Sequence, residues 1–154
     1  MKLKIKDIIF IIGLFGLDIL SKQLIQNNIE IGQSIPIIEG FFDITYVKNT
    51  GAAWSILEGK MLFFYLITII GLIFMIYLLK NIKDNIIEKY AIFMMLAGTI
   101  GNLYDRIVYQ YVRDFLDFII FGYDFPVFNL ADSFLCIGVF ILIISTLYDE
   151  YKMK

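Results

Sequence analysis

The sequence contains no histidine and a single cysteine, Cys136. The lack of histidine excludes Ser-His-Asp and Cys-His catalysis and the usual zinc sites, and a lone cysteine excludes a disulfide within the chain. Charge is also scarce, with a net value of −2, so no strongly basic face indicates a nucleic-acid partner. Any chemistry must therefore come from Asp, Glu, Lys, Arg, Ser, Thr, Tyr or backbone groups.

Apolar residues, in contrast, are abundant. Hydrophobic residues make up 60% of the 154-residue chain and aromatic residues 17%, which is too much apolar surface for a soluble domain of this length. We expect an integral membrane protein with one domain over residues 1–154 and four spans. The predicted spans are residues 8–25, 61–79, 90–103 and 127–148. The segment 26–30 has no small-residue cleavage site, so the first span is expected to be retained rather than removed as a signal peptide.

The basic residues predict an orientation. Four spans place both termini on one side, and the segments on that side carry eight Lys or Arg residues, against five in the remainder. Positive-inside reasoning puts the termini in the cytoplasm. The connections 27–60 and 106–126 are then extracytoplasmic. Residues 42–48 alternate and are rich in β-branched and aromatic side chains, which predicts a strand in the first of them, whereas the second is expected to be an interfacial loop.

The last span begins with polar side chains on one face. Asn129, Asp132, Ser133 and Cys136 follow the helical spacing i, i+3, i+4 and i+7. An ionisable residue inside a span indicates a functional site, because its burial costs several kcal/mol unless a partner or water compensates. The alternative is that Asp132 only caps the helix N-terminus at the membrane surface.

An acid and a base also lie within the first span. Asp18 and Lys22 are four residues apart with the acid first, the favourable order for a helical ion pair. We expect the pair to be structural, because each charge makes the other tolerable, and a role in lining a site is the alternative.

With this topology, polar residues from separate segments meet at one depth near the extracytoplasmic face. They are Asn49, Asn102, Arg106, Asp114, Asn129 and Asp132. Two carboxylates without histidine or an activated nucleophile suit an acid-base pair that activates water. Asp114 and Asp132 are the candidates, with Asn129 orienting Asp132 and Arg106 supporting the site or binding substrate.

Five motifs occur in order along the chain: Asp18-x-x-Ser21-Lys22, Asn49-x-Gly51-Ala52-Ala53-Trp54-Ser55, Gly101-Asn102-Leu103-Tyr104-Asp105-Arg106, Val112-x-Asp114-Phe115 and Phe128-Asn129-x-Ala131-Asp132-Ser133. Together they resemble lipoprotein signal peptidase, also called signal peptidase II, a membrane aspartyl protease of the bacterial cytoplasmic membrane.

The resemblance implies a mostly helical membrane protein, with four transmembrane helices and a small extracytoplasmic β-cradle around residues 35–58. It implies cleavage of diacylglyceryl-modified prolipoproteins just before the lipidated cysteine, without a cofactor or a metal. Substrate and membrane lipid are the implied partners. Asp114 and Asp132 match the catalytic pair of the family. The positions that would shape the substrate pocket or support the pair are Asp18, Lys22, Asn49, Asn102, Arg106 and Asn129.

Other function classes remain open on the residues alone. A proton-coupled transporter would use Asp18 or Asp132, although transporters usually place such groups near the midplane. A metal hydrolase would take Asp114, Asp132 and Asn129 as oxygen ligands. A Ser-Lys peptidase is disfavoured because Ser21 and Lys22 point about 100° apart on a helix. A purely structural membrane protein leaves the polar convergence unexplained.

Overall fold

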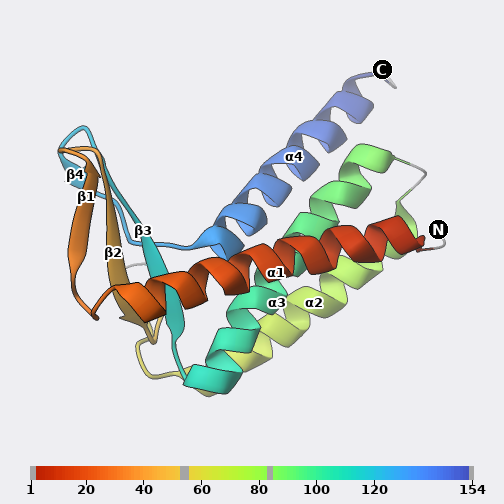
Figure 1. The fold of residues 1–154 in the computed structure, drawn as a ribbon. Coiled ribbons are helices and arrows are strands. Elements are labelled where there is room, and N and C mark those ends of the chain that lie inside the picture. Colours follow the sequence, from red (N-terminus) through yellow and green to blue (C-terminus); the bar gives the residue numbers. More distant parts are fainter. Residues whose placement is uncertain (1–2, 53–55, 83–84, 153–154) are drawn as a thin grey trace.

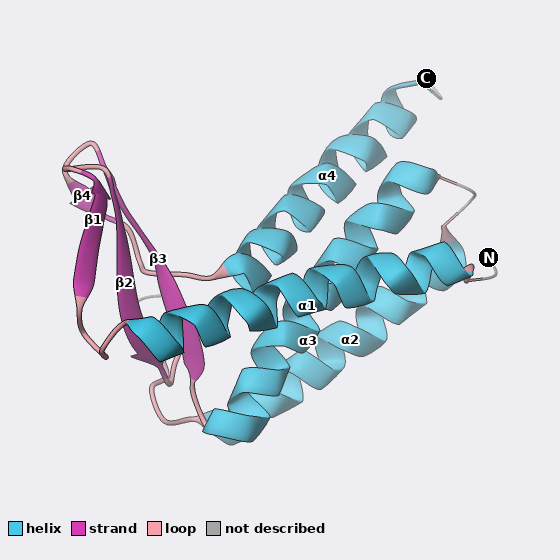
Figure 2. Cartoon of the chain, in the orientation of Figure 1, coloured by secondary structure: helices cyan, strands magenta, loops and turns pink. Residues whose placement is uncertain are grey.

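The computed structural model describes residues 3–52, 56–82 and 85–152. Four long helices form a bundle, and a small sheet lies at the end of the bundle opposite the N and C labels (Figures 1 and 2). The helices are α1 (Ile5–Asn28), α2 (Met61–Asn81), α3 (Ile86–Tyr109) and α4 (Leu130–Lys152). The strands are β1 (Ser34–Ile38), β2 (Phe42–Asn49), β3 (Val112–Ile120) and β4 (Tyr123–Asp124).

Within the described residues, four helices are long and apolar enough to cross a membrane: Ile5–Asn28, Met61–Asn81, Ile86–Tyr109 and Leu130–Asp149. The most apolar stretches of α1, α2 and α4 are only 11% buried inside the protein, whereas that of α3 is 50% buried. Helix α3 is therefore the central element, and the other three expose apolar side chains as lipid-facing helices do. The predicted fold class, four transmembrane helices with a small sheet, is confirmed.

Helix α3 is longer than the predicted span 90–103. It begins after Asn85, whose side chain accepts hydrogen bonds from two backbone N–H groups of the first turn, and it ends at Gln110, which adopts a left-handed conformation with φ 64°. The prediction that a loop starts at Arg106 is wrong, because Arg106 and Asp105 both lie within this helix. The predicted span ended before Asp105 and Arg106 because a hydropathy pattern counts every charged residue as unfavourable in a membrane, whether or not it is buried in the protein.

The sheet is antiparallel with strand order β1-β2-β3-β4. The strand predicted over residues 42–48 is β2, and it pairs with β1 on one side and β3 on the other. Strand β3 lies in the segment that was expected to be an interfacial loop, so half of the sheet comes from outside the expected range 35–58. The pairs Lys48 with Arg113 and Asn49 with Val112 place the start of β3 against the end of β2. Ala53, Trp54 and Ser55, part of a predicted motif, lie outside the described residues.

Helices α3 and α4 approach so closely that their glycines leave no room for a side chain. A Cβ on Gly98 would collide with the carbonyl oxygen of Ala131, and one on Gly138 would lie 2.6 Å from the carbonyl oxygen of Ala91. Such small-residue contacts allow direct backbone packing between membrane helices. Gly101 meets Ala131 in the same way, so the start of α4 is fixed against the middle of α3.

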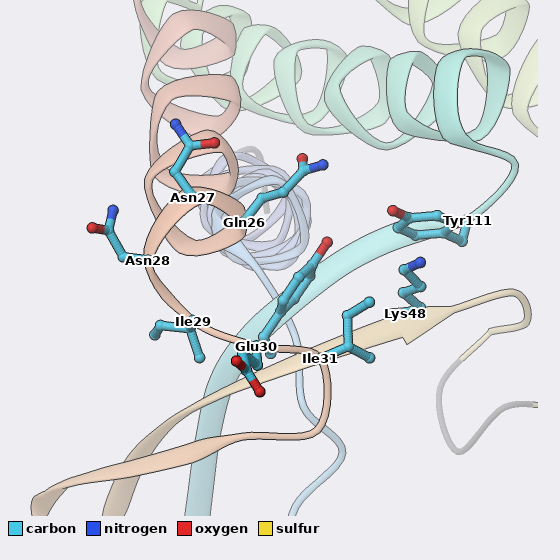
Figure 3. Close-up of a pocket in the computed structure, with 9 residues that line it drawn as sticks. Gln26, Asn27, Asn28, Ile29, Glu30, Ile31, Lys48 and Tyr111 are labelled. Atoms are coloured by element: carbon cyan, nitrogen blue, oxygen red, sulfur yellow. The ribbon is translucent and has the colours of Figure 1, made fainter.

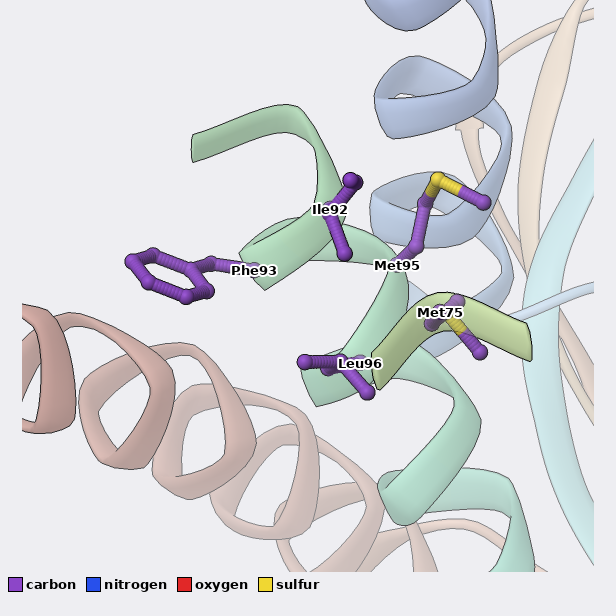
Figure 4. Packing of buried hydrophobic residues seen from close by; sticks show 5 residues of the cluster. All are labelled: Met75, Ile92, Phe93, Met95 and Leu96. Carbon is purple, nitrogen blue, oxygen red and sulfur yellow. The ribbon is translucent and has the colours of Figure 1, made fainter. Parts of the chain in front are cut away.

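The buried apolar cluster joins α2 to α3. It consists of Met75 from α2 and four residues of α3, namely Ile92, Phe93, Met95 and Leu96 (Figure 4). Phe93 and Ile92 have no exposed surface. The cluster lies on the part of α3 that precedes Asn102. The first part of this helix therefore packs in the apolar core, and its last part carries the polar residues.

Candidate active site

Asp114 and Asp132 line one pocket of about 450 Å³. Asp114 comes from β3 and is 2% exposed, and Asp132 comes from the first turn of α4. The other polar residues of the pocket come from β2, α3 and α4 itself. They are Asn49, Asn102, Arg106, Ser133 and Cys136. Three of the six predicted supporting residues, Asn49, Asn102 and Arg106, therefore line the pocket with both candidate acids, and a fourth, Asn129, holds Asp114 without lining it.

Two side-chain amides hold the carboxylate of Asp114. Asn49 Nδ2 donates to Oδ2 at 2.9 Å, and Asn129 Nδ2 donates to Oδ1 at 2.6 Å. Burial, reinforced by the neighbouring Asp132 carboxylate, raises the pKa of Asp114 to about 7, although the two amides favour the ionised form. Asp114 is therefore able to hold or release a proton near neutral pH.

Asp132 is held by both the backbone and a side chain. Asn102 Nδ2 donates to Oδ1 at 2.7 Å, and the backbone N–H of Asn129 donates to Oδ2 at 3.2 Å. In return, Asn129 Oδ1 accepts the backbone N–H of Asp132 at 3.0 Å. This reciprocal pair is the geometry of a capping box. Asp132 is thus a helix cap and also a wall of the pocket, and α4 starts at Leu130 rather than at the predicted Val127 because Asn129 ends the extended chain.

Arg106 and Asn49 order the rim of the pocket. Asn49 Oδ1 accepts the N–H of Gly51 at 2.9 Å, a local turn that fixes its amide toward Asp114. Arg106 Nη2 donates to the carbonyl oxygen of Gly51 at 3.2 Å, and its guanidinium lies over the ring of Phe64, 4.7 Å from the centroid. The buried Nε of Arg106 has no hydrogen-bond partner among the described residues. One donor at the pocket therefore stays available.

Asp18 and Lys22 form the predicted ion pair, with 2.8 Å between Lys22 Nζ and Asp18 Oδ2, and neither side chain has exposed surface. They lie behind the pocket rather than in its lining. Lys22 Nζ also donates to Asn102 Oδ1 at 3.0 Å, and Asp18 Oδ1 accepts the backbone N–H of Ala131 at 2.9 Å. The pair therefore contacts the groups that hold Asp132 and the start of α4.

Two residues outside the predicted set belong to this arrangement. Asp105 and Arg113 are fully buried and pair with 2.7 Å between Arg113 Nη2 and Asp105 Oδ1. The sequence carried one signal for Arg113: it precedes Asp114, so in a strand its side chain lies on the opposite face of the sheet. A charge on a buried face requires a partner.

A second and more open pocket, of about 590 Å³, lies beside the end of α1 (Figure 3). Its lining includes Gln26, Lys48 and Tyr111 but none of the predicted site residues. Lys48 pairs with Arg113 across the strands, whereas Asn49 pairs with Val112, so the two pockets lie on opposite faces of the β2–β3 ribbon. Gln26 Oε1 accepts a hydrogen bond of 2.8 Å from Arg113 Nη1, which connects this pocket to the buried charges.

Two solved structures share this fold over nearly the whole chain. One, described as a bacterial membrane enzyme structure obtained by the in meso method, is 43% identical, with a TM-score of 0.90, and the match covers 97% of this chain and 92% of that chain. Another of the same description is 44% identical, with a TM-score of 0.84 and 94% of each chain covered. The four spans, the polar pocket and these likenesses together define a multi-pass membrane enzyme.

The family follows from a match along the sequence. The model of the family described as signal peptidase (SPase) II matches residues 10–148. The chain belongs to the signal peptidase II family and is a membrane protease, as the motifs in the sequence indicated.

Proposed function

We propose that this protein removes the signal peptide from diacylglyceryl-modified prolipoproteins, cutting immediately before the lipidated cysteine, with Asp114 and Asp132 as its catalytic pair. The observation that carries the proposal is the meeting of these two carboxylates in one pocket, each held by amide donors from other elements. Membership of the signal peptidase II family supports the substrate class.

In the proposed reaction the ionised member of the pair takes a proton from water while the protonated member donates to the scissile carbonyl or the leaving nitrogen. The water oxygen bonds to the carbonyl carbon directly, so no covalent enzyme intermediate forms. The raised pKa of Asp114, about 7, favours a pair that shares one proton at neutral pH. Asn49, Asn102 and Asn129 orient the two carboxylates, because their amides reach the acids at 2.6 to 2.9 Å.

The lining of the pocket supports a lipidated substrate. Phe125, Pro126, Val127 and Phe128 form an apolar wall immediately before α4. Such a wall suits acyl chains, because the free energy falls when their apolar surface is buried away from water. Arg106 lies at the same pocket with an unused Nε donor, which suits a carbonyl or ester oxygen of the substrate.

We place the protein in the bacterial cytoplasmic membrane with cytoplasmic termini and with the pocket near the extracytoplasmic face. The distribution of basic residues supports this orientation. The start of α1 and the last turns of α4 lie at the end of the bundle away from the sheet, as an even number of spans requires (Figure 1).

The test uses the purified protein in detergent with a lipidated prolipoprotein, and cleavage is scored by mass. Asp114→Asn and Asp132→Asn should each abolish cleavage, since Asn matches the shape of Asp but cannot exchange the proton. The double variant should be hardly slower than either single one, because the pair works as a unit. Asp124→Asn is the matched control, since Asp124 is exposed in β4 and should leave cleavage unchanged.

Three results would contradict this function. Cleavage that persists in either Asn variant would remove the proposed pair, and cleavage that stops with a chelator and returns with Mg²⁺ would favour the metal hydrolase. A wild-type protein that does not cleave but moves protons in vesicles would favour the transporter.

A further inference from the structure

Four charged side chains without exposed surface form a second layer behind the pocket: Asp18, Lys22, Asp105 and Arg113. They come from α1, α3 and β3, and their formal charges sum to zero. Buried charges of this kind persist only when each is paired, and removal of one partner leaves the other uncompensated. The role of Arg113 in this layer is not indicated by the sequence motifs, where its position is the variable one between Val112 and Asp114.

Arg113 is the main partner of Asp105. Its Nε donates to Asp105 Oδ2 at 3.1 Å and its Nη2 to Oδ1 at 2.7 Å, a two-pronged contact that only a guanidinium can make. The backbone N–H of Arg113 also donates to Asp105 Oδ2 at 3.0 Å. Asp105 therefore fixes the main chain of β3 at the residue immediately before Asp114.

Three oxygen atoms lie near the ammonium group of Lys22. Its Nζ lies 2.8 Å from Asp18 Oδ2 and 3.0 Å from Asn102 Oδ1, but 3.6 Å from Asp105 Oδ2. At this distance Lys22 and Asp105 form an ion pair without a hydrogen bond, and Asp105 Oδ2 accepts hydrogen bonds from Arg113 instead. Lys22 is thereby left on Asn102, whose Nδ2 donates to Asp132.

We propose that Arg113 is a positioning residue for the Asp114–Asp132 pair. It neutralises Asp105, so that Lys22 keeps its hydrogen bond to Asn102. Its own hydrogen bonds with Asp105 also hold the main chain of β3 next to Asp114. This inference rests on the proposed function, since it assigns Arg113 to the same reaction. Arg113 acts through Asp105 and Asn102 and does not line the pocket itself.

Loss of Arg113 should alter the charge around the pair as well as its geometry. The charged groups that act directly on the two acids are Lys22 from α1 and Arg106 from α3. Asp105 from α3 and Arg113 from β3 lie behind them, where Asp105 is paired with Arg113. Without Arg113 the second layer carries a net negative charge, which disfavours ionisation of the pair. The acid limb of the pH profile of kcat/KM should then move to higher pH.

The experiment compares three variants with the wild type on the lipidated prolipoprotein over a range of pH. Arg113→Gln should lower kcat about 100-fold, the size expected for a small misplacement of reacting groups, with little change in KM and with the acid limb at higher pH. Arg113→Lys keeps the charge and should keep the acid limb in place. Arg113→Gln combined with Asp105→Asn removes both charges and should return the limb toward its wild-type position, although the rate stays low.

Two results would overturn the proposal. One is wild-type kinetics in Arg113→Gln. The other is an equal loss of rate in all three variants with an unmoved pH profile, which would indicate that Arg113 serves folding only. Thermal unfolding of each variant identifies those that fold poorly, and Arg113→Lys or the double variant then supplies the comparison.

A failure of the proposed function is recognised separately. If the wild type does not cleave, the carboxyl ¹³C signal of Asp114, assigned by its loss in Asp114→Asn, is titrated in the wild type and in Arg113→Gln. A titration that moves to higher pH in Arg113→Gln supports the charge coupling, and an unchanged titration overturns it, whatever the substrate of the protein.

Discussion

Asn129 and Asp132 exchange backbone-to-side-chain hydrogen bonds at the start of α4, at 3.2 Å to Asp132 Oδ2 and 3.0 Å to Asn129 Oδ1. Asn129 Nδ2 then remains free to donate to Asp114 at 2.6 Å and to Asn102 Oδ1 at 3.1 Å. One asparagine therefore caps a membrane helix and joins the two candidate acids. The helix cap and the geometry of the two acids therefore depend on the same side chain.

Asn129→Ala should lower both stability and cleavage. The lost cap costs about 1 to 2 kcal/mol in the free energy of unfolding, and Asp114 loses its shortest hydrogen bond. Asn85→Ala is the matched control, because Asn85 caps α3 at the other end of the bundle. Thermal unfolding in detergent should show similar losses for the two variants, whereas only Asn129→Ala should lose cleavage. Equal activity in both would refute a role for Asn129 in the site.

The stability of the protein should fall as pH rises between about 4 and 7. The native carboxyl of Asp114, whose pKa is about 7, keeps its proton in that range, while an Asp of the unfolded chain, with a pKa near 4, has lost it. The native state thus binds more protons, and its stability declines with increasing pH. Asp114→Asn removes the contribution of Asp114 to this dependence, so its stability should fall less between pH 5 and pH 8 than that of the wild type. Unfolding midpoints at pH 5 and pH 8 measure the pH dependence of stability in both proteins. Equal shifts of the midpoint in the wild type and Asp114→Asn would show that Asp114 does not cause it.

Lys22→Met should destabilise the protein by about 3 to 5 kcal/mol, because it leaves Asp18 buried without a cation. Lys89→Met is the control, since Lys89 pairs with the buried Asp7 in the part of the bundle near the chain termini, 2.5 Å apart. Both variants should lose stability. Only Lys22→Met should also lower the cleavage rate of the protein that remains folded, because Lys22 contacts Asn102. A folded Lys22→Met protein with normal stability and no cleavage would instead give Lys22 a direct part in the reaction.

Gly101→Ala should prevent normal packing of α1, α3 and α4. An added Cβ would collide with Asp18 Oδ2 and would lie 3.2 Å from the Cβ of Ala131. Gly13→Ala in α1 meets nothing within 4 Å and serves as the control, with stability unchanged or slightly raised. Yield and unfolding midpoint in detergent should fall for Gly101→Ala alone. A normal midpoint would mean that the start of α4 is not packed against α3 as described.

The orientation can be tested with single cysteines in a Cys136→Ala background. Gln33 is exposed just before β1, and Lys80 is exposed near the end of α2 at the opposite end of the bundle. In intact cells an impermeant thiol reagent should label Gln33→Cys, and Lys80→Cys should react only after lysis. The reverse pattern would overturn cytoplasmic termini.

Local features of the sequence determined much of this architecture. Long apolar runs identified four spans, because the length of a spanning helix follows from the thickness of the bilayer. The i, i+4 spacing of Asp18 and Lys22 predicted their ion pair, and the alternation over residues 42–48 predicted β2. Motif resemblance supplied Asp114 and Asp132 as candidates, and the structure places them in one pocket.

Only the tertiary structure decided what the other charged residues do. The segment that contains Arg113 and Asp114 was expected to be an interfacial loop. Both residues instead lie buried in a strand, where Asp105 pairs with Arg113 and two asparagines hold Asp114. Lys22 reaches Asn102, 80 residues later in the chain, through a contact that no local pattern encodes. Hydropathy is a sum over neighbours in sequence, whereas the free energy of a buried charge depends on its partners in space. For this reason the spans and the Asp18–Lys22 pair could be predicted from the sequence, whereas the Asp105–Arg113 pair and the contact of Lys22 with Asn102 could not.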